Sequence, residues 1–202
     1  MTAVISSDYN DKYLWFIPLT VWLWNKLGVN VVCFMPYENT AGERFMLISD
    51  TLIKNKSKGV IYNFNSVPHK TVTYTQCSRL FSGCLDLPED ECVVVGDCDM
   101  GVFSKAFEYL DDGRIHSVGY DLLDVDAMQQ IPMCYLAMPV KEWRKIMDVN
   151  GRAYQQCLDD LVGVIECEHF KGNQWSLDQF TIYNQFKKHG ISPVIHKRAK
   201  MP

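Results

Sequence analysis

Residues 92 to 99 read CVVVGDCD, an apolar run and a glycine followed by two aspartates on either side of a cysteine. Residues 92–95 show no polar alternation, which is typical of a strand buried on both faces. Such strands belong to parallel sheets covered by helices, and open α/β sheets bind ligands beyond the carboxyl ends of their strands. We therefore expect Asp97 and Asp99 at the ligand-binding edge of an α/β sheet.

The spacing of the two aspartates predicts a metal site. In extended chain, Asp97 and Asp99 point to one side and Cys98 to the other. Two adjacent carboxylates in a cleft are costly unless a cation neutralises them. Oxygen ligands favour a hard ion, Mg²⁺ or Mn²⁺, which also binds water and substrate phosphates. The alternative is a solvated turn with two capping carboxylates.

Around this stretch, short apolar runs alternate with amphipathic segments, which indicates a mostly parallel α/β sheet with right-handed crossovers. Ser176 is expected to cap the last helix, and residues 111–126 are expected to be rich in loops. The predicted strands are 2–6, 29–35, 59–63, 92–95 and 133–138, and the predicted helices are 18–27, 44–54, 74–85, 141–148 and 177–188.

The composition is that of an ordinary globular protein, with 202 residues of which 48% are hydrophobic and 22% charged, so we expect one domain. The net charge of −4 argues against a nucleic-acid partner. None of the 8 cysteines forms a C-x-x-C pair, which favours free thiols in a reducing compartment.

The N-terminus shows no secretory signal pattern, so we expect a cytoplasmic protein. The most apolar segment, residues 13–24, contains Pro18 and is shorter than the roughly 20 residues that span a bilayer. Its aromatic residues are expected to pack in the core, and a membrane-surface role for its tryptophans stays open.

The stretch SRLFSGCLDLPEDECVVVGDCDMGVF, residues 78–103, resembles the helix, turn, strand and D-x-D core of GT-A glycosyltransferases. It is most similar to the glycogenin and bacterial galactosyltransferase group and to small viral enzymes of that fold. If the protein is viral, the cytoplasm in which we expect it is that of the host. Later fragments, CYLAM, KEWRKIM and WSLDQFTIYNQ, fit the family in the same order. The resemblance implies a Rossmann-like sheet, with a donor-binding half at 1–105 and an acceptor-binding half at 106–202.

For the donor, the resemblance implies that the turn with Ser6, Asp8 and Tyr9 holds the nucleobase. Arg79 lies off the apolar stripe of its predicted helix and would pair with diphosphate or sugar oxygens, with a surface salt bridge as the alternative.

At the metal, the resemblance implies that Asp97 contacts the ribose or a metal-bound water and that Asp99 binds the ion, with Cys98 beside them at the donor. It also implies a third metal ligand, His196, with Lys197 supplying charge to phosphate. The glycine and tryptophan neighbours usual in the family are absent from this tail.

Asp178 and Gln179 are the residues that the resemblance places at the sugar and acceptor. If the reaction inverts the anomeric centre, Asp178 would be the base that deprotonates the acceptor. If it retains configuration, Asp178 would orient the sugar and Gln179 would lie beneath the anomeric carbon. A helix N-terminal carboxylate with no further role is the alternative for Asp178.

The expected function is therefore metal-dependent transfer of a hexose-type sugar from a UDP-sugar to a saccharide or protein-glycan acceptor, with Mn²⁺ or Mg²⁺ as the ion. Alternatives are a sugar transferase acting on modified DNA bases and a nucleotidyltransferase. The second is disfavoured because the N-terminal turn SSDYNDKY contains no glycine. A non-catalytic binding module is disfavoured because both carboxylates are present.

Overall fold

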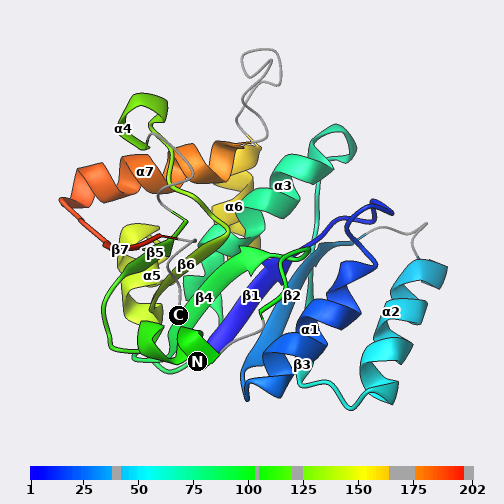
Figure 1. Cartoon of the computed structure of the whole chain (residues 1–202). Helices are drawn as coiled ribbons and strands as arrows, with labels where there is room; N and C mark the ends of the chain where they lie inside the picture. Colours follow the sequence, from blue (N-terminus) through cyan, green and yellow to red (C-terminus); the bar gives the residue numbers. More distant parts are fainter. Residues whose placement is uncertain (38–41, 103–104, 120–124, 164–175, 198–202) are drawn as a thin grey trace.

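The computed structural model describes residues 1–37, 42–102, 105–119, 125–163 and 176–197. Within them, seven strands form one sheet in the order β3-β2-β1-β4-β6-β5-β7 (Figure 1). The strands are β1 Thr2–Ser6, β2 Asn30–Pro36, β3 Gly59–Phe64, β4 Cys92–Asp97, β5 His116–Val118, β6 Tyr135–Pro139 and β7 Val194–His196. Only β6 runs antiparallel to its neighbours, β4 and β5. The predicted α/β class with a mostly parallel sheet is confirmed.

Helices cover both faces of this sheet. One hydrophobic cluster joins α1 and α2 to one face, and a second joins α3, α5, α6 and α7 to the other. The α-helices are α1 Phe16–Lys26, α2 Gly42–Lys54, α3 Thr71–Ser78, α4 Val125–Met128, α5 Val140–Ile146, α6 Tyr154–Val162 and α7 Leu177–His189. The 3₁₀ helices are η1 Pro68–Lys70, η2 Arg79–Cys84 and η3 Lys105–Leu110.

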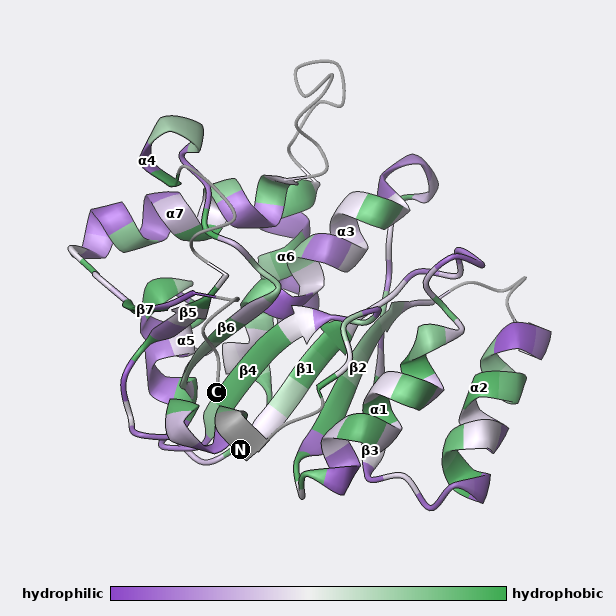
Figure 2. Ribbon diagram, in the orientation of Figure 1, coloured by the Kyte–Doolittle hydropathy of each residue, from purple (hydrophilic) through white to green (hydrophobic). Residues whose placement is uncertain are grey.

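Strand β4 is buried on both faces, as its sequence predicts. Val93 and Val95 belong to one cluster, and Cys92 and Val94 to the other. In Figure 2, β1, β2 and β4 are hydrophobic over most of their length. This double burial fixes β4 in the middle of the sheet and puts Asp97 at its carboxyl end.

The single helix expected over 74–85 is wrong. Helix α3 ends at Ser78, and η2 follows with Phe81 at φ −94° and ψ 27°, outside helical geometry. The hydroxyls of Ser78 and Ser82 donate to carbonyls three residues earlier, which favours a tighter turn. Arg79 is the first residue of η2, two residues before this departure from helical geometry.

Several elements were missed in the sequence, among them the short helices α4, η1 and η3. Strand β5 lies within the predicted loop region, β7 lies in the C-terminal tail, and α6 was not predicted. The short strands β5 and β7 pair with each other, and the backbone amide of Gly119 donates to the carbonyl of His196. Pairing between segments so distant in sequence leaves no local pattern, so only the tertiary structure reveals it. None of the helices in the described ranges is long and apolar enough to cross a bilayer.

Candidate active site

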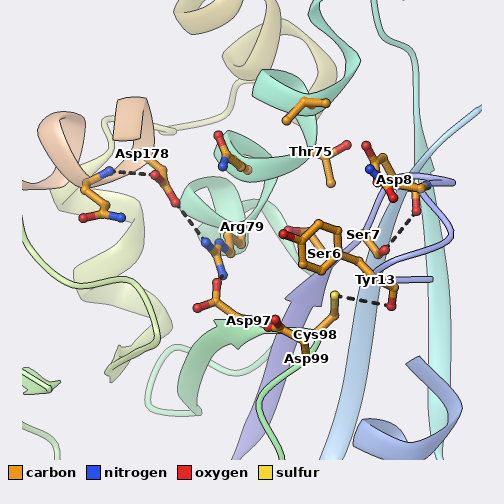
Figure 3. Close-up of a pocket in the computed structure, with 14 residues that line it drawn as sticks. Ser6, Ser7, Asp8, Tyr13, Thr75, Arg79, Asp97, Cys98, Asp99 and Asp178 are labelled. Carbon is orange, nitrogen blue, oxygen red and sulfur yellow. Dashed lines mark hydrogen bonds and ion pairs between the residues drawn. The ribbon is translucent and has the colours of Figure 1, made fainter. Parts of the chain in front are cut away.

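A pocket opens at the carboxyl ends of β1 and β4 (Figure 3). Because β1 and β4 are parallel neighbours and Ser6 is in register with Asp97, the turns after both strands meet at this edge. Four segments line the pocket. They contribute Ser6, Ser7, Asp8, Asn10 and Tyr13 after β1, then Val72, Thr75, Gln76 and Arg79 from α3 and η2, Asp97, Cys98 and Asp99 after β4, and Asp178 and Gln179 from α7.

The two aspartates lie differently from the extended geometry that was predicted. Strand β4 ends at Asp97, and the chain then turns, with the amide of Met100 donating to the Asp97 carbonyl at 3.3 Å. The hydroxyl of Thr20, on α1, donates to the carbonyl of Cys98 at 2.5 Å. Buried Cys98 thus anchors the turn on α1, and Asp99 is left exposed at the pocket.

Arg79 lies between two carboxylates in Figure 3. One terminal nitrogen, Nη1, donates to Asp97 Oδ1 at 2.6 Å and to the carbonyl of Gly96 at 2.7 Å. The other, Nη2, donates to Asp178 Oδ2 at 3.0 Å. Burial alone would lower the pKa of Arg79, but Asp97 and Asp178 outweigh it and raise the pKa. Arg79 is therefore a permanently charged, buried cation that joins β4 to α7.

Asp178 is the second residue of α7, and its side chain is only 2% exposed. Both carboxylate oxygens are engaged: Oδ2 accepts from Arg79, and Oδ1 accepts from the backbone amide of Gln179 at 2.9 Å. Burial raises the pKa of Asp178 against the opposing effect of Arg79. The expected cap, Ser176, makes no side-chain capping hydrogen bond, so the α7 N-terminus is held through Asp178 instead.

Three residues predicted at the site lie elsewhere. Tyr9 is packed in the core with α1, and Tyr13 lines the pocket in its place. His196 lies in β7, where its Nε2 is 2.9 Å from Nδ1 of His116 and the two rings stack. Lys197 follows, exposed, and neither residue lines the pocket. The predicted third ligand and phosphate contact are thus not brought to Asp97 and Asp99.

Several pocket residues were missed in the sequence. Asn10 and Tyr13 lie in the same polar turn as Asp8, so that turn was the available signal for them. Thr75 and Gln76 lie on α3 about one turn before Arg79, and the packing of α3 against β1 and β2 brings them to the site. No residue pattern marks these two in advance.

The carboxylates in the pocket fit a metal ion that is also coordinated by the substrate. Asp97 and Asp99 bring carboxylate oxygens to the pocket, and one oxygen of Asp97 accepts a hydrogen bond from Arg79. In the described part of the chain, no group of three or more histidine, cysteine or acidic residues gathers as a metal site. Mg²⁺ and similar ions are often held by one or two carboxylates, with phosphates and water completing the shell. A site with two carboxylates therefore fits an ion that binds together with a diphosphate.

No protein-family model matches the chain, and no curated protein matches it. Among solved structures, it matches galactosyltransferase LgtC in complex with donor and acceptor sugar analogues. The TM-score is 0.58 with 14% identity, over 98% of this chain and 73% of that one. This chain has a GT-A glycosyltransferase fold. An active-site mutant of LgtC gives a TM-score of 0.52 with 13% identity, over 98% of this chain and 87% of the mutant. At this level of identity the match confirms the predicted fold, and the activity has to be argued from the site.

Proposed function

We propose that this chain is a metal-dependent glycosyltransferase that moves a hexose from a UDP-sugar to a saccharide or protein-glycan acceptor. The observation that carries the proposal is the meeting of Asp97, Asp99, Arg79 and Asp178 in one pocket at the carboxyl edge of a GT-A sheet. Residues 1–105 would supply most of the donor site and residues 106–202 the acceptor side, with α7 reaching the pocket from the second half.

The turn after β1 would hold the nucleobase. Asp8 lines the pocket, and its Oδ1 is fixed by the amide of Asn10 at 3.1 Å. A carboxylate accepts the ring N–H of uracil or guanine, whereas cytosine and adenine present an acceptor at the corresponding edge. Tyr13 is half-buried at the same pocket and offers a ring for stacking. Together these residues favour a nucleobase with a ring N–H donor, such as the uracil of a UDP-sugar, and Ser6 lines the same pocket at the end of β1.

Asp97 and Asp99 would hold the metal ion with the diphosphate of the donor. When bound, the ion offsets the negative charge that develops on the departing nucleotide. Asp99 is the exposed ligand at the mouth of the pocket, and Asp97 is oriented by Arg79. Arg79 adds a fixed positive charge close to the sugar and diphosphate.

At the sugar, the contacts of α7 favour an orienting role for Asp178 over the role of a base. Both of its oxygens accept hydrogen bonds, and the carboxylate is buried beside Arg79. A base must have an oxygen within reach of the acceptor hydroxyl. Gln179, half-buried and lining the pocket, would then lie beneath the anomeric carbon, which corresponds to retention of configuration.

A thermal-shift series tests the function. A ligand that binds only the folded state raises stability by mass action. We expect UDP-hexoses to raise the melting temperature in the presence of Mn²⁺, and CDP- and ADP-sugars to raise it less. The matched control is Asp90→Asn, a surface residue paired with Lys141, which should respond as the wild type does. An equal response to UDP-sugars in excess chelator would contradict the assignment.

A further inference from the structure

The outer side of α1 is apolar although it faces solvent. Trp15 and Trp22 are 47% and 43% exposed, and Phe16 and Leu19 are exposed with them. Residues 15, 19 and 22 recur at the spacing of one helical face, so these side chains form a stripe along α1. The sequence led us to expect the aromatic residues of this segment in the core. Trp24 is buried there at 1% exposure, but for Trp15, Phe16 and Trp22 the expectation is wrong. The stripe therefore remains without a partner in the described part of the chain.

Helix α2 extends this apolar surface. Both helices cover the same face of the sheet and lie side by side there (Figures 1 and 2). The side of α2 that packs on the sheet uses Ile48 and Leu52, while Met46, Leu47 and Ile53 are exposed. We call the exposed apolar surface of the two helices, Trp15, Phe16, Leu19, Trp22, Met46, Leu47 and Ile53, the α1–α2 face.

Lysines gather where these helices end. Lys26 lies in the last turn of α1, with its ammonium 5.2 Å from the centre of the Trp22 ring. The side chain of Asn25 bonds the backbone of Lys58, which holds the segment after α2 against the end of α1. That segment, residues 54–58, reads KNKSK, and its three lysines are exposed.

Few acidic residues lie close to these lysines in the sequence. The sequence has no Asp or Glu between Asp11 and Glu38, and none between Asp50 and Asp86. On α2, Glu43 and Asp50 are also exposed, and Asp50 lies one helical turn before Lys54. The α1–α2 face is thus an aromatic and aliphatic surface bordered by positive charge at the C-terminal ends of its two helices.

We propose that the α1–α2 face docks on a bilayer surface that contains anionic lipids. Tryptophan, phenylalanine and leucine on one helical face, with lysines at its border, are the features of segments that lie in the headgroup region. Anionic headgroups complement the four lysines, Lys26, Lys54, Lys56 and Lys58. Tyr13, which lines the pocket, is two residues from Trp15, so docking would hold one wall of the pocket near the lipid surface. This inference does not depend on the proposed function.

Vesicle sedimentation with the full chain tests the proposal. We expect it to bind vesicles of phosphatidylcholine with phosphatidylglycerol, and to bind pure phosphatidylcholine much more weakly. Lys54→Gln, Lys56→Gln and Lys58→Gln, all at exposed positions, should each lower the binding constant about fivefold and reduce its salt dependence. Trp15→Ser with Trp22→Ser should lower it about tenfold or more, because the buried apolar area is lost.

The matched control is Met128→Ser with Ile195→Ser, two exposed apolar residues outside the α1–α2 face, which should bind as the wild type does. Circular dichroism checks that each variant is folded. If the tryptophan double variant is unfolded, the lysine variants decide the outcome. Absence of wild-type binding to anionic vesicles would overturn the proposal, as would an equal loss in the control. So would sedimentation showing a dimer that Trp15→Ser with Trp22→Ser converts to monomer, since a second copy would then cover the face.

Discussion

Arg79 and Asp178 form a buried ion pair of 3.0 Å across 99 residues of sequence. The Arg79 and Asp178 side chains are 7% and 2% exposed, so water screens their interaction only weakly. Arg79 also pairs with Asp97, which connects the ends of β4 and α7 through one guanidinium. The two halves of the chain therefore meet at the pocket through a charge network that stabilises the fold and orients the site.

Removing Arg79 should destabilise the protein. Arg79→Leu leaves Asp178 buried without its partner, which costs about 3–5 kcal/mol of unfolding free energy. In Arg79→Leu with Asp178→Leu the unpaired buried charge is gone, so we expect the double variant to recover part of that loss. Urea unfolding of the two single variants and the double variant gives the coupling energy. Additive losses would show that the pair has no energetic coupling.

Asp99→Asn should remove metal-dependent donor binding with little effect on the fold. Its carboxylate is exposed at the pocket, so the change in stability should stay within about 0.5 kcal/mol. Isothermal titration of UDP-sugar with and without Mn²⁺ measures the effect. The control is Asp90→Asn, which removes one exposed carboxylate of the same kind outside the pocket and should leave donor binding unchanged. If Asp99→Asn kept a donor affinity that depended on Mn²⁺, the ion would have to bind elsewhere.

Asp8→Asn should weaken binding of uridine nucleotides, because an amide is a weaker acceptor for the ring N–H than a carboxylate. The loss of a hydrogen bond to a charged group predicts a fall in affinity of about tenfold to a hundredfold. Asp11→Asn is the matched control, since Asp11 lies in the same turn but outside the pocket and pairs with Arg44. Equal affinities for UDP in both variants would exclude Asp8 from the nucleobase.

Stability should fall on mild acidification through His196. Burial, His116 and Arg114 lower the pKa of His196 below its ordinary value of 6.5. The unfolded chain then binds the proton more tightly than the folded protein, so stability is lost as the pH falls from about 6.5 through the lowered pKa. His196→Gln should flatten this dependence in chemical unfolding between about pH 8 and about pH 5.

The same variant reports on the metal site. His196 lies on β7 against His116 and outside the pocket, so His196→Gln should bind donor with unchanged Mn²⁺ dependence. If the variant lost its dependence on Mn²⁺, His196 would have to be a metal ligand after all.

The sequence by itself determined the central strand and its chemistry. An apolar run without polar alternation is typical of a strand buried on both faces, so β4 was expected inside a sheet with Asp97 after its carboxyl end. The D-x-D spacing and the preceding segment with Arg79 then indicated the edge of the sheet at which the pocket lies. These features are local, which is why the fold and the two carboxylates could be predicted.

The tertiary structure decided what local patterns do not encode. The turn after β1 holds two tyrosines, and packing against α1 buries Tyr9 and leaves Tyr13 at the pocket. His196 had the residue type of a ligand, but pairing of β7 with β5 placed it beside His116. Arg79 meets Asp178 because the chain turns at η2 and α7 returns to the same edge. Each outcome depends on contacts between segments far apart in sequence, which only the folded chain brings together.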